Sequence, residues 1–235
     1  MKQRISNGLA ALGLTPPPGA VEALAEYGRL LLEQNQVMNL TAITEPDQVV
    51  DLHFLDSAAL LGTADFRGKT LVDVGTGAGF PGLPLRLLEP ALRVTLVDSL
   101  GKRIHWLEAV CAALQVEDTV CLHARAEELS LNRTYRDAFD FATARAVAPL
   151  NLLCELCLPY VKPGGRFLSM KSVDCQAELD SAQSAIQRLG GRLLPAYDYT
   201  IPGTAITHRV VLVEKVAPTP KGYPRRWAKI QKAPL

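Results

Sequence analysis

Apolar positions repeat with two different periods along the chain, and the change between them falls near residue 67. Within residues 21–32 they recur at the spacing of one helix face. A second helical pattern follows Pro46, a residue suited to a first helical turn. Farther along, short apolar runs alternate with amphipathic stretches. We therefore expect a helical extension over residues 1–66 and a strand–helix region over residues 67–216.

The strand–helix region predicts a mostly parallel sheet. Its apolar runs suggest strands at residues 70–75, 93–99, 119–126, 139–146 and 165–172. Helical patterns separate them at residues 81–89, 102–115, 147–160 and 175–189. This alternation is typical of a doubly wound, Rossmann-like α/β fold with helices on both faces of the sheet. Residues 193–202 and 207–216 predict a hairpin that ends the sheet in an antiparallel strand.

The composition fits one folded domain with an extension, because 48% of the 235 residues are hydrophobic and 21% are charged. The net charge of +1 hides an uneven distribution. A third segment, residues 217–235, has no acidic residue, so the rest of the chain has a net charge of −4. The five cations of this basic C-terminal tail are Lys221, Arg225, Arg226, Lys229 and Lys232.

The cysteines indicate a reducing compartment. Five of them at loose spacings do not suggest a disulfide framework. Cys154 and Cys157 match half of a metal motif, but they lie in an apolar helix-like run without a second ligand pair, so we expect no metal. We see neither a signal peptide nor a membrane span in the sequence. We therefore expect a cytoplasmic protein without a membrane partner.

The stretch VDVGTGAGFPGLPL follows the first predicted strand and has the strand–glycine turn–helix arrangement of a nucleotide-binding unit. Two registers compete for it. The dinucleotide fingerprint GxGxxG is matched by Gly77, Gly79 and Gly82. The acid-x-Gly-x-Gly-x-Gly pattern of S-adenosylmethionine methyltransferases is matched by Asp73, Gly75, Gly77 and Gly79.

The strand register and the acid favour the second pattern. The turn begins at Gly75, and the third glycine of a dinucleotide fingerprint would then fall on Phe80. A carboxylate at position 73 would repel a phosphate, whereas S-adenosylmethionine carries an ammonium and a sulfonium and no phosphate. Asp73 could pair with that ammonium or could only cap the turn. Both interpretations of its role stay open.

Asp98 is the second acidic candidate. It ends the second predicted strand, 23 residues after Gly75. Acids about 20 residues beyond such a turn bind ribose hydroxyls. The alternative is a helix N-cap for the segment that starts near Lys102. The position favours the ribose role, although one residue could serve both purposes.

Several blocks of sequence then match one family. They are NLTAI (residues 39–43), HFLDS (53–57), the glycine stretch, LVDSLGKR (96–103), ARAEEL (124–129) and ARAVAPL (144–150). The first two and the last are not general methyltransferase motifs. With these blocks the chain resembles, from about residue 35 to residue 171, the bacterial guanine-N7 methyltransferases of small-subunit ribosomal RNA, the glucose-inhibited division protein B family.

This resemblance implies a class I methyltransferase fold, S-adenosyl-L-methionine as cofactor, and methylation of guanine N7 in the 530 loop of 16S ribosomal RNA. The partner would be 16S ribosomal RNA or the small-subunit particle, and we expect a monomer. The implied cofactor contacts are Gly75 and Phe80 in the glycine loop, Asp98 at the ribose, Ala126 and Glu127 at the adenine, and Arg145 beside the cofactor.

The chemistry of guanine N7 agrees with the absence of a general base in the motifs. N7 has a free lone pair and no proton to lose, so the protein needs only to position the reactants, which can lower a barrier by about 7–11 kcal/mol. Arg145 is our candidate for such a positioning role, through the guanine edge or a phosphate. Alternatively, it pairs with an acid such as Asp73 or Glu127.

His53 and Asp56 would share a helix face, as a structural pair or as substrate contacts.

The predicted RNA-binding surface combines the basic tail with cations near the carboxyl edge of the sheet. Cations neutralise phosphates, and Tyr223 and Trp227 between them could stack on unpaired bases. The alternative is a solvated terminus. The residues that we assign to RNA binding are Lys102, Arg103, Arg209, Lys221, Arg225, Arg226 and Lys229.

Three other functions remain as alternatives at this point. The first is a methyltransferase of the same fold with a small-molecule or protein substrate. The second is an NAD-dependent oxidoreductase that uses the Gly77–Gly82 register, for which the sequence offers no hydride-transfer partner. The third is a non-catalytic RNA-binding module.

Overall fold

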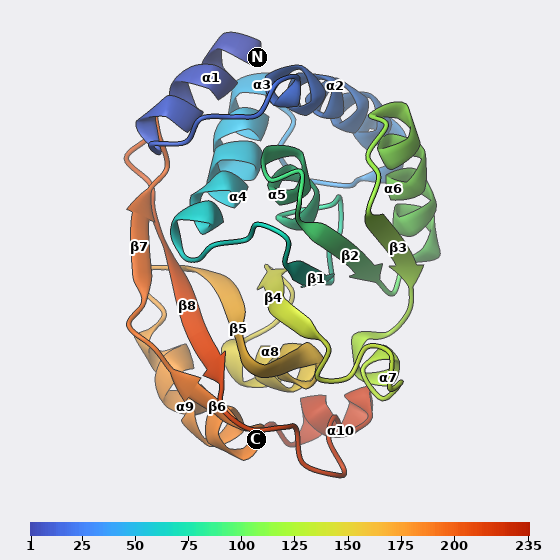
Figure 1. Cartoon of the computed structure of the whole chain (residues 1–235), viewed down its shortest axis with the longest axis vertical. Coiled ribbons are helices and arrows are strands. Elements are labelled where there is room, and N and C mark those ends of the chain that lie inside the picture. The colour runs from blue at the N-terminus through green and yellow to red at the C-terminus, as the bar shows by residue number, and fades with distance from the viewer.

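A single twisted sheet organises the chain, and the computed structural model describes residues 1–235. The strands lie in the order β3-β2-β1-β4-β5-β8-β6, and β7 also pairs with β8 (Figure 1). Their bounds are β1 (Thr70–Val74), β2 (Arg93–Asp98), β3 (Thr119–His123), β4 (Phe139–Arg145), β5 (Val161–Ser172), β6 (Gly191–Leu193), β7 (Tyr197–Thr200) and β8 (Thr207–Lys215).

Five strands are parallel and the far edge is antiparallel, as the sequence predicts. β1 pairs in parallel with β2 and β4, while β5 pairs antiparallel with β8. The predicted hairpin is formed by β7 and β8. The predicted strand over residues 193–202 is wrong in one respect, since β6 and β7 are separate strands on one edge of β8. Pro195 lies between them, and it cannot donate a ladder hydrogen bond.

Helices cover both faces of the sheet. They are α1 (Lys2–Ala11), α2 (Ala20–Met38), α3 (Pro46–Val49), α4 (Asp56–Ala58), α5 (Gly82–Leu88), α6 (Gly101–Ala113), α7 (Ala126–Leu129), α8 (Leu150–Cys157), α9 (Gln176–Arg188) and α10 (Trp227–Lys232). Between α3 and α4 runs a π-helical turn, η1 (Val50–Leu55), and two 3₁₀ turns are η2 (Ala59–Gly62) and η3 (Leu158–Tyr160). None of the helices has the length and apolar character needed to cross a membrane.

Two apolar cores lie on opposite faces of the sheet. Along β1, Leu71 belongs to a core shared with α1, α2, α5 and α6, whereas Val72 belongs to a core shared with α8 and α9. This alternation follows from the two-residue period of a strand. The N-terminal helices contribute Leu24, Tyr27 and Phe54 to the first core. They therefore pack as a layer on the sheet.

Candidate cofactor and substrate site

The glycine loop leaves β1 at the carboxyl edge of the sheet. Gly75 has a φ of +68°, and its N–H donates to the carbonyl of Val97 at 2.8 Å. A Cβ at this position would lie 2.6 Å from Cγ2 of Val147. Only glycine combines this left-handed backbone with so close a neighbour.

Asp98 fixes the glycine loop from the neighbouring strand. Its side chain is 5% exposed, and its carboxylate accepts the N–H groups of Gly77 and Leu100, each at 2.9 Å. Helix α6 begins at Gly101 with Leu100 as its N-cap residue, so Asp98 is not the cap. The carboxylate keeps further lone pairs for a ligand.

A cavity gathers four of the predicted cofactor residues. Gly75 comes from β1's end, Asp98 from β2, and Ala126 and Glu127 from α7. The predicted strand over residues 119–126 is wrong at its end, because β3 stops at His123 and α7 starts at Ala126. The short helix places Glu127, which is 5% exposed, in the cavity wall.

The cavity suits a nucleoside with an uncharged base. It has a buried acid for hydroxyl groups, a bare-backbone glycine, and apolar walls from Val74, Val97 and Leu156. Of its two acids, Glu127 pairs with Arg125 of the same lining at 2.7 Å, so the carboxylate of Asp98 is the group that disfavours a phosphate. A buried acid, a glycine backbone and apolar walls are the features that S-adenosylmethionine requires of a site, so these residues fit that cofactor.

Asp73 lies behind the loop and does not line this cavity. It is fully buried, and its Oδ2 accepts the Thr76 hydroxyl at 2.7 Å and the Gly82 N–H at 2.9 Å. Burial raises the pKa of Asp73 to about 6, although these hydrogen bonds favour the charged form. Its Oδ1 has no hydrogen-bond partner. The contacts show a residue that braces the turn.

Phe80, Gly77 and Gly79 also lie outside the cavity lining. Gly77 reaches the site through its N–H bond to Asp98, and a Cβ on Gly79 would collide with the Tyr27 hydroxyl. The Phe80 ring is 4% exposed and stacks on His53, with the ring centroids 4.3 Å apart. The loop is therefore clamped onto the N-terminal helices.

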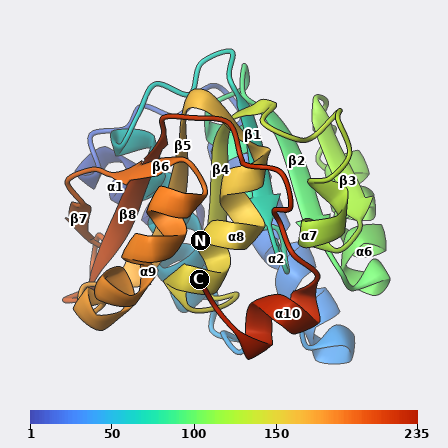
Figure 2. The ribbon, with the colours of Figure 1, turned by 90° about the horizontal axis from the view of Figure 1, so that it is seen from below.

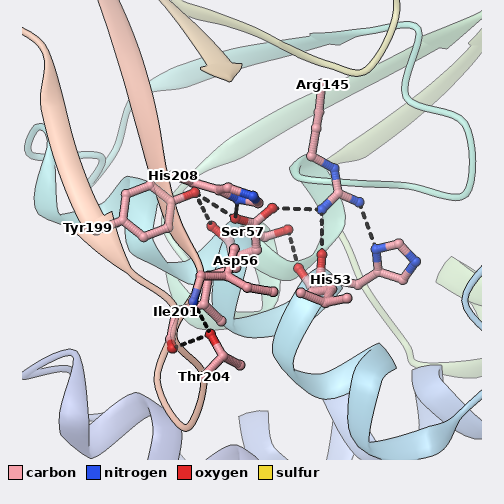
Figure 3. Close-up of polar contacts among 10 residues, drawn as sticks. His53, Asp56, Ser57, Arg145, Tyr199, Ile201, Thr204 and His208 are labelled. Carbon is pink, nitrogen blue, oxygen red and sulfur yellow. Dashed lines mark hydrogen bonds and ion pairs between the residues drawn. The ribbon is translucent and has the colours of Figure 1, made fainter. Parts of the chain in front are cut away.

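Arg145 ends β4 and joins the N-terminal helices to the sheet edge. It donates to the carbonyl of Leu52 at 2.8 Å, to Oδ2 of Asp56 at 2.9 Å, and to Nδ1 of His53 at 2.9 Å (Figure 3). Its acid partner is thus Asp56 rather than Asp73 or Glu127. His53 and Asp56, which we predicted to share a helix face, both bind this guanidinium.

His53 is held as a neutral imidazole. Burial is the main reason that its pKa falls to about 3, and the positive charge of Arg145 adds to the effect. A guanidinium only donates, so Nδ1 must accept and the proton must be on Nε2. Nε2 lies 2.9 Å from the Thr41 hydroxyl. The NLTAI and HFLDS blocks therefore belong to one network.

Asp56 connects the same network to the far hairpin. Its Oδ1 accepts the Tyr199 hydroxyl at 2.6 Å and lies 2.7 Å from Nδ1 of His208 (Figure 3). Burial alone would raise the Asp56 pKa, but the bonds from His208 and Tyr199 and the Arg145 charge lower it. The bond to Asp56 raises the pKa of His208. Sequence reasoning missed Tyr199 and His208, since only the fold brings β7 and β8 to Asp56 at the start of α4.

The predicted RNA-binding cations fall into two groups. Lys102, Lys221, Arg226 and Lys229 are exposed and have no acidic partner within ion-pair distance. The other three are engaged within the fold. Arg103 lies 3.5 Å from Asp98, Arg209 pairs with Asp198 at 2.7 Å, and Arg225 pairs with Glu155 at 2.6 Å.

Sequence comparisons point to one family. Residues 20–197 match the model described as GidB, rRNA small subunit methyltransferase G. The chain is 43% identical to the ribosomal RNA small subunit methyltransferase G of Alkaliphilus metalliredigens, over all of this chain and 98% of that protein. It is 44% identical to the protein of the same name from Lachnoclostridium phytofermentans, over 97% of this chain and 95% of that protein.

Solved structures agree on the fold. TrmN from Thermus thermophilus is 25% identical, with a TM-score of 0.53 over 69% of this chain and 48% of that chain. A SAM-dependent O-methyltransferase from Thermotoga maritima, 17% identical, has a TM-score of 0.53 over 81% of this chain and 73% of that chain. The predicted class I methyltransferase fold is confirmed.

Proposed function

Because the chain belongs to the GidB family of rRNA small subunit methyltransferases G, we propose that it methylates N7 of a guanine in the 530 loop of 16S ribosomal RNA. Membership makes it a ribosomal RNA methyltransferase that uses S-adenosylmethionine. The position on the RNA and the residues in contact are our proposal. The cavity that unites Gly75, Asp98, Ala126 and Glu127 supports the cofactor contacts, and the resemblance of the sequence blocks supports the position on the RNA.

The cofactor would lie in this cavity, with Asp98 accepting hydrogen bonds from its ribose hydroxyls. When bound, it supplies an electrophilic methyl group on a sulfonium. The guanine would enter at the neighbouring strand end. β1 and β4 pair Asp73 with Thr143, so Arg145 lies level with Gly75 at the same edge. Val147, just beyond Arg145, lines the cavity itself.

Arg145 would hold the guanine without touching the reacting atom. Three of the five N–H donors of its guanidinium bind protein acceptors, so two remain. A donor at N7 would occupy the lone pair that attacks the methyl group. We therefore assign guanine O6 or a nearby phosphate to Arg145. No residue has to remove a proton, which agrees with a neutral His53 that is already hydrogen-bonded.

The experiment for this proposal maps 7-methylguanosine in 16S ribosomal RNA from cells with and without this protein. We expect the modification in the 530 loop to disappear without it and to return with the wild-type chain. An unchanged 530 loop, together with tight S-adenosylhomocysteine binding by the pure protein, would indicate another RNA position or substrate.

Gly75→Ala tests the cavity. A left-handed alanine costs about 1–2 kcal/mol, and the new methyl group would displace Val147 into the ligand space. We expect S-adenosylhomocysteine affinity, measured by calorimetry, to fall at least about tenfold. Gly13→Ala is the matched control, since Gly13 has a φ of +72° and open space around it. Equal affinities for the two variants would contradict the cavity assignment.

Arg226→Ala and Lys229→Ala test the RNA surface. Each should weaken binding to a 530-loop RNA and reduce the slope of log K against log salt by about 0.7 per lost phosphate contact. Cofactor binding should not change. Arg29→Ala is the control, because Arg29 is exposed but already paired with Glu26 and Glu33. A slope unchanged by the tail variants would rule out the tail as a phosphate-binding surface.

A further inference from the structure

The basic tail is a docked part of the fold. After β8 it runs along the face of the sheet that carries α8, and it ends in α10, which lies near α7 and α8 (Figure 2). Arg136 holds the crossing segment, since its guanidinium donates to the carbonyls of Thr219 at 2.9 Å and Tyr223 at 2.8 Å. Ile230 of α10 is fully buried in the core that contains α8.

A buried ion pair fixes the point at which α10 begins. Glu155 of α8 is fully buried, and its carboxylate accepts Nε of Arg225 at 2.8 Å and a terminal nitrogen at 2.6 Å. The Arg225 backbone N–H donates to the same carboxylate at 2.8 Å. Breaking such a pair leaves a buried charge without a partner, which is strongly unfavourable. The residues after Arg225 therefore have a defined position.

Trp227, two residues later, lines the cofactor cavity together with Gly75 and Asp98. It also lines a second cavity, and Arg125 and Glu127 line both cavities as well. Trp227 therefore borders the cofactor cavity together with Glu127, on the side that we assign to the adenine. Its indole adds a broad apolar and aromatic wall to a site otherwise built from the strand ends and α7.

We propose that Trp227 is a cofactor-binding residue and that the docked tail covers the adenine end of the cavity. This inference rests on the proposed cofactor site. It assigns the indole to the adenine ring rather than to an RNA base, and it divides the tail by function. Arg225 holds the tail in place and Trp227 completes the cofactor site, while the exposed Arg226 and Lys229 side chains remain free for RNA.

The test is calorimetric titration of S-adenosylhomocysteine into the full-length wild type and the Trp227→Ala, Trp227→Phe and Gln231→Ala variants; Gln231 is an exposed residue of α10. We expect the dissociation constant to rise about tenfold for Trp227→Ala, less for Trp227→Phe, and not at all for Gln231→Ala. A Trp227→Ala constant within twofold of the wild type would overturn the inference. A wild type that binds NAD but not S-adenosylhomocysteine would instead overturn the proposed function.

A fluorescence readout covers the case in which Trp227→Ala fails to fold. The chain has two tryptophans, and the other, Trp106, is 8% exposed in α6. In a Trp106→Phe variant all tryptophan emission comes from Trp227. We expect saturating S-adenosylhomocysteine to change its intensity, because adenine in contact with the indole alters its surroundings. Binding measured by calorimetry without any change in emission would overturn the inference.

Discussion

Asp98→Ala is expected to lower the affinity for S-adenosylhomocysteine by about a hundredfold or more. Hydrogen bonds to a charged group contribute about 1.5–3 kcal/mol each, and a ribose offers two hydroxyls to the carboxylate. The variant also leaves the Gly77 and Leu100 N–H groups without their acceptor. The glycine loop should therefore loosen at the same time as the ribose contact is lost.

Calorimetry with Glu108→Ala as the control separates these effects from a change in net charge. Glu108 is an exposed acid on α6, so its removal alters the charge equally and leaves the cavity intact. We expect wild-type affinity for Glu108→Ala, and a thermal unfolding temperature for Asp98→Ala that still shows a folded protein. A folded Asp98→Ala with wild-type affinity would remove the ribose role from Asp98.

The fold could be predicted because its signals are local. Apolar runs such as TLVDV and RVTLVD need only their own residues to suggest buried strands, and both are strands of the sheet. The position of Asp98 at the carboxyl end of β2 was predictable too, because Asp98 ends an apolar run. Two local details escaped prediction, namely the end of β3 at His123, just before α7, and the break between β6 and β7.

The network around Arg145 could not be predicted, because its members come from four distant parts of the chain. Thr41, Asp56 and His208 carry no pattern that connects them, and the π-helical turn that directs His53 has no sequence signature. The role of Trp227 was hidden for a related reason. In the sequence it belongs to a basic tail, and only the pair between Arg225 and Glu155 places it at the cavity.

Asp56→Ala is expected to lower the free energy of unfolding by about 3–5 kcal/mol, because it removes one partner of a largely buried ion pair. Asp56 is 2% exposed, and the Arg145 side chain is 17% exposed. Asp198→Ala is the matched control, since it breaks the pair with Arg209 at the surface, where Asp198 is 44% exposed. Such surface pairs contribute about 1 kcal/mol or less. Equal losses in urea unfolding would contradict a structural role for the Asp56 network.

The pH dependence of this network separates its two histidines. The His208 pKa is raised in the folded state, so the stability it contributes is complete below about pH 6.5 and is lost as pH rises through the raised value. His53 has the opposite sign, because its pKa falls to about 3 and its neutral form is favoured. The stability linked to His53 is present above about pH 6.5 and is lost as pH falls below it.

The difference in unfolding free energy between the wild type and His208→Gln should therefore be larger at acidic than at alkaline pH. A difference that does not vary with pH would mean that His208 does not form a charged pair with Asp56. Arg145 would then be the only cationic partner of Asp56.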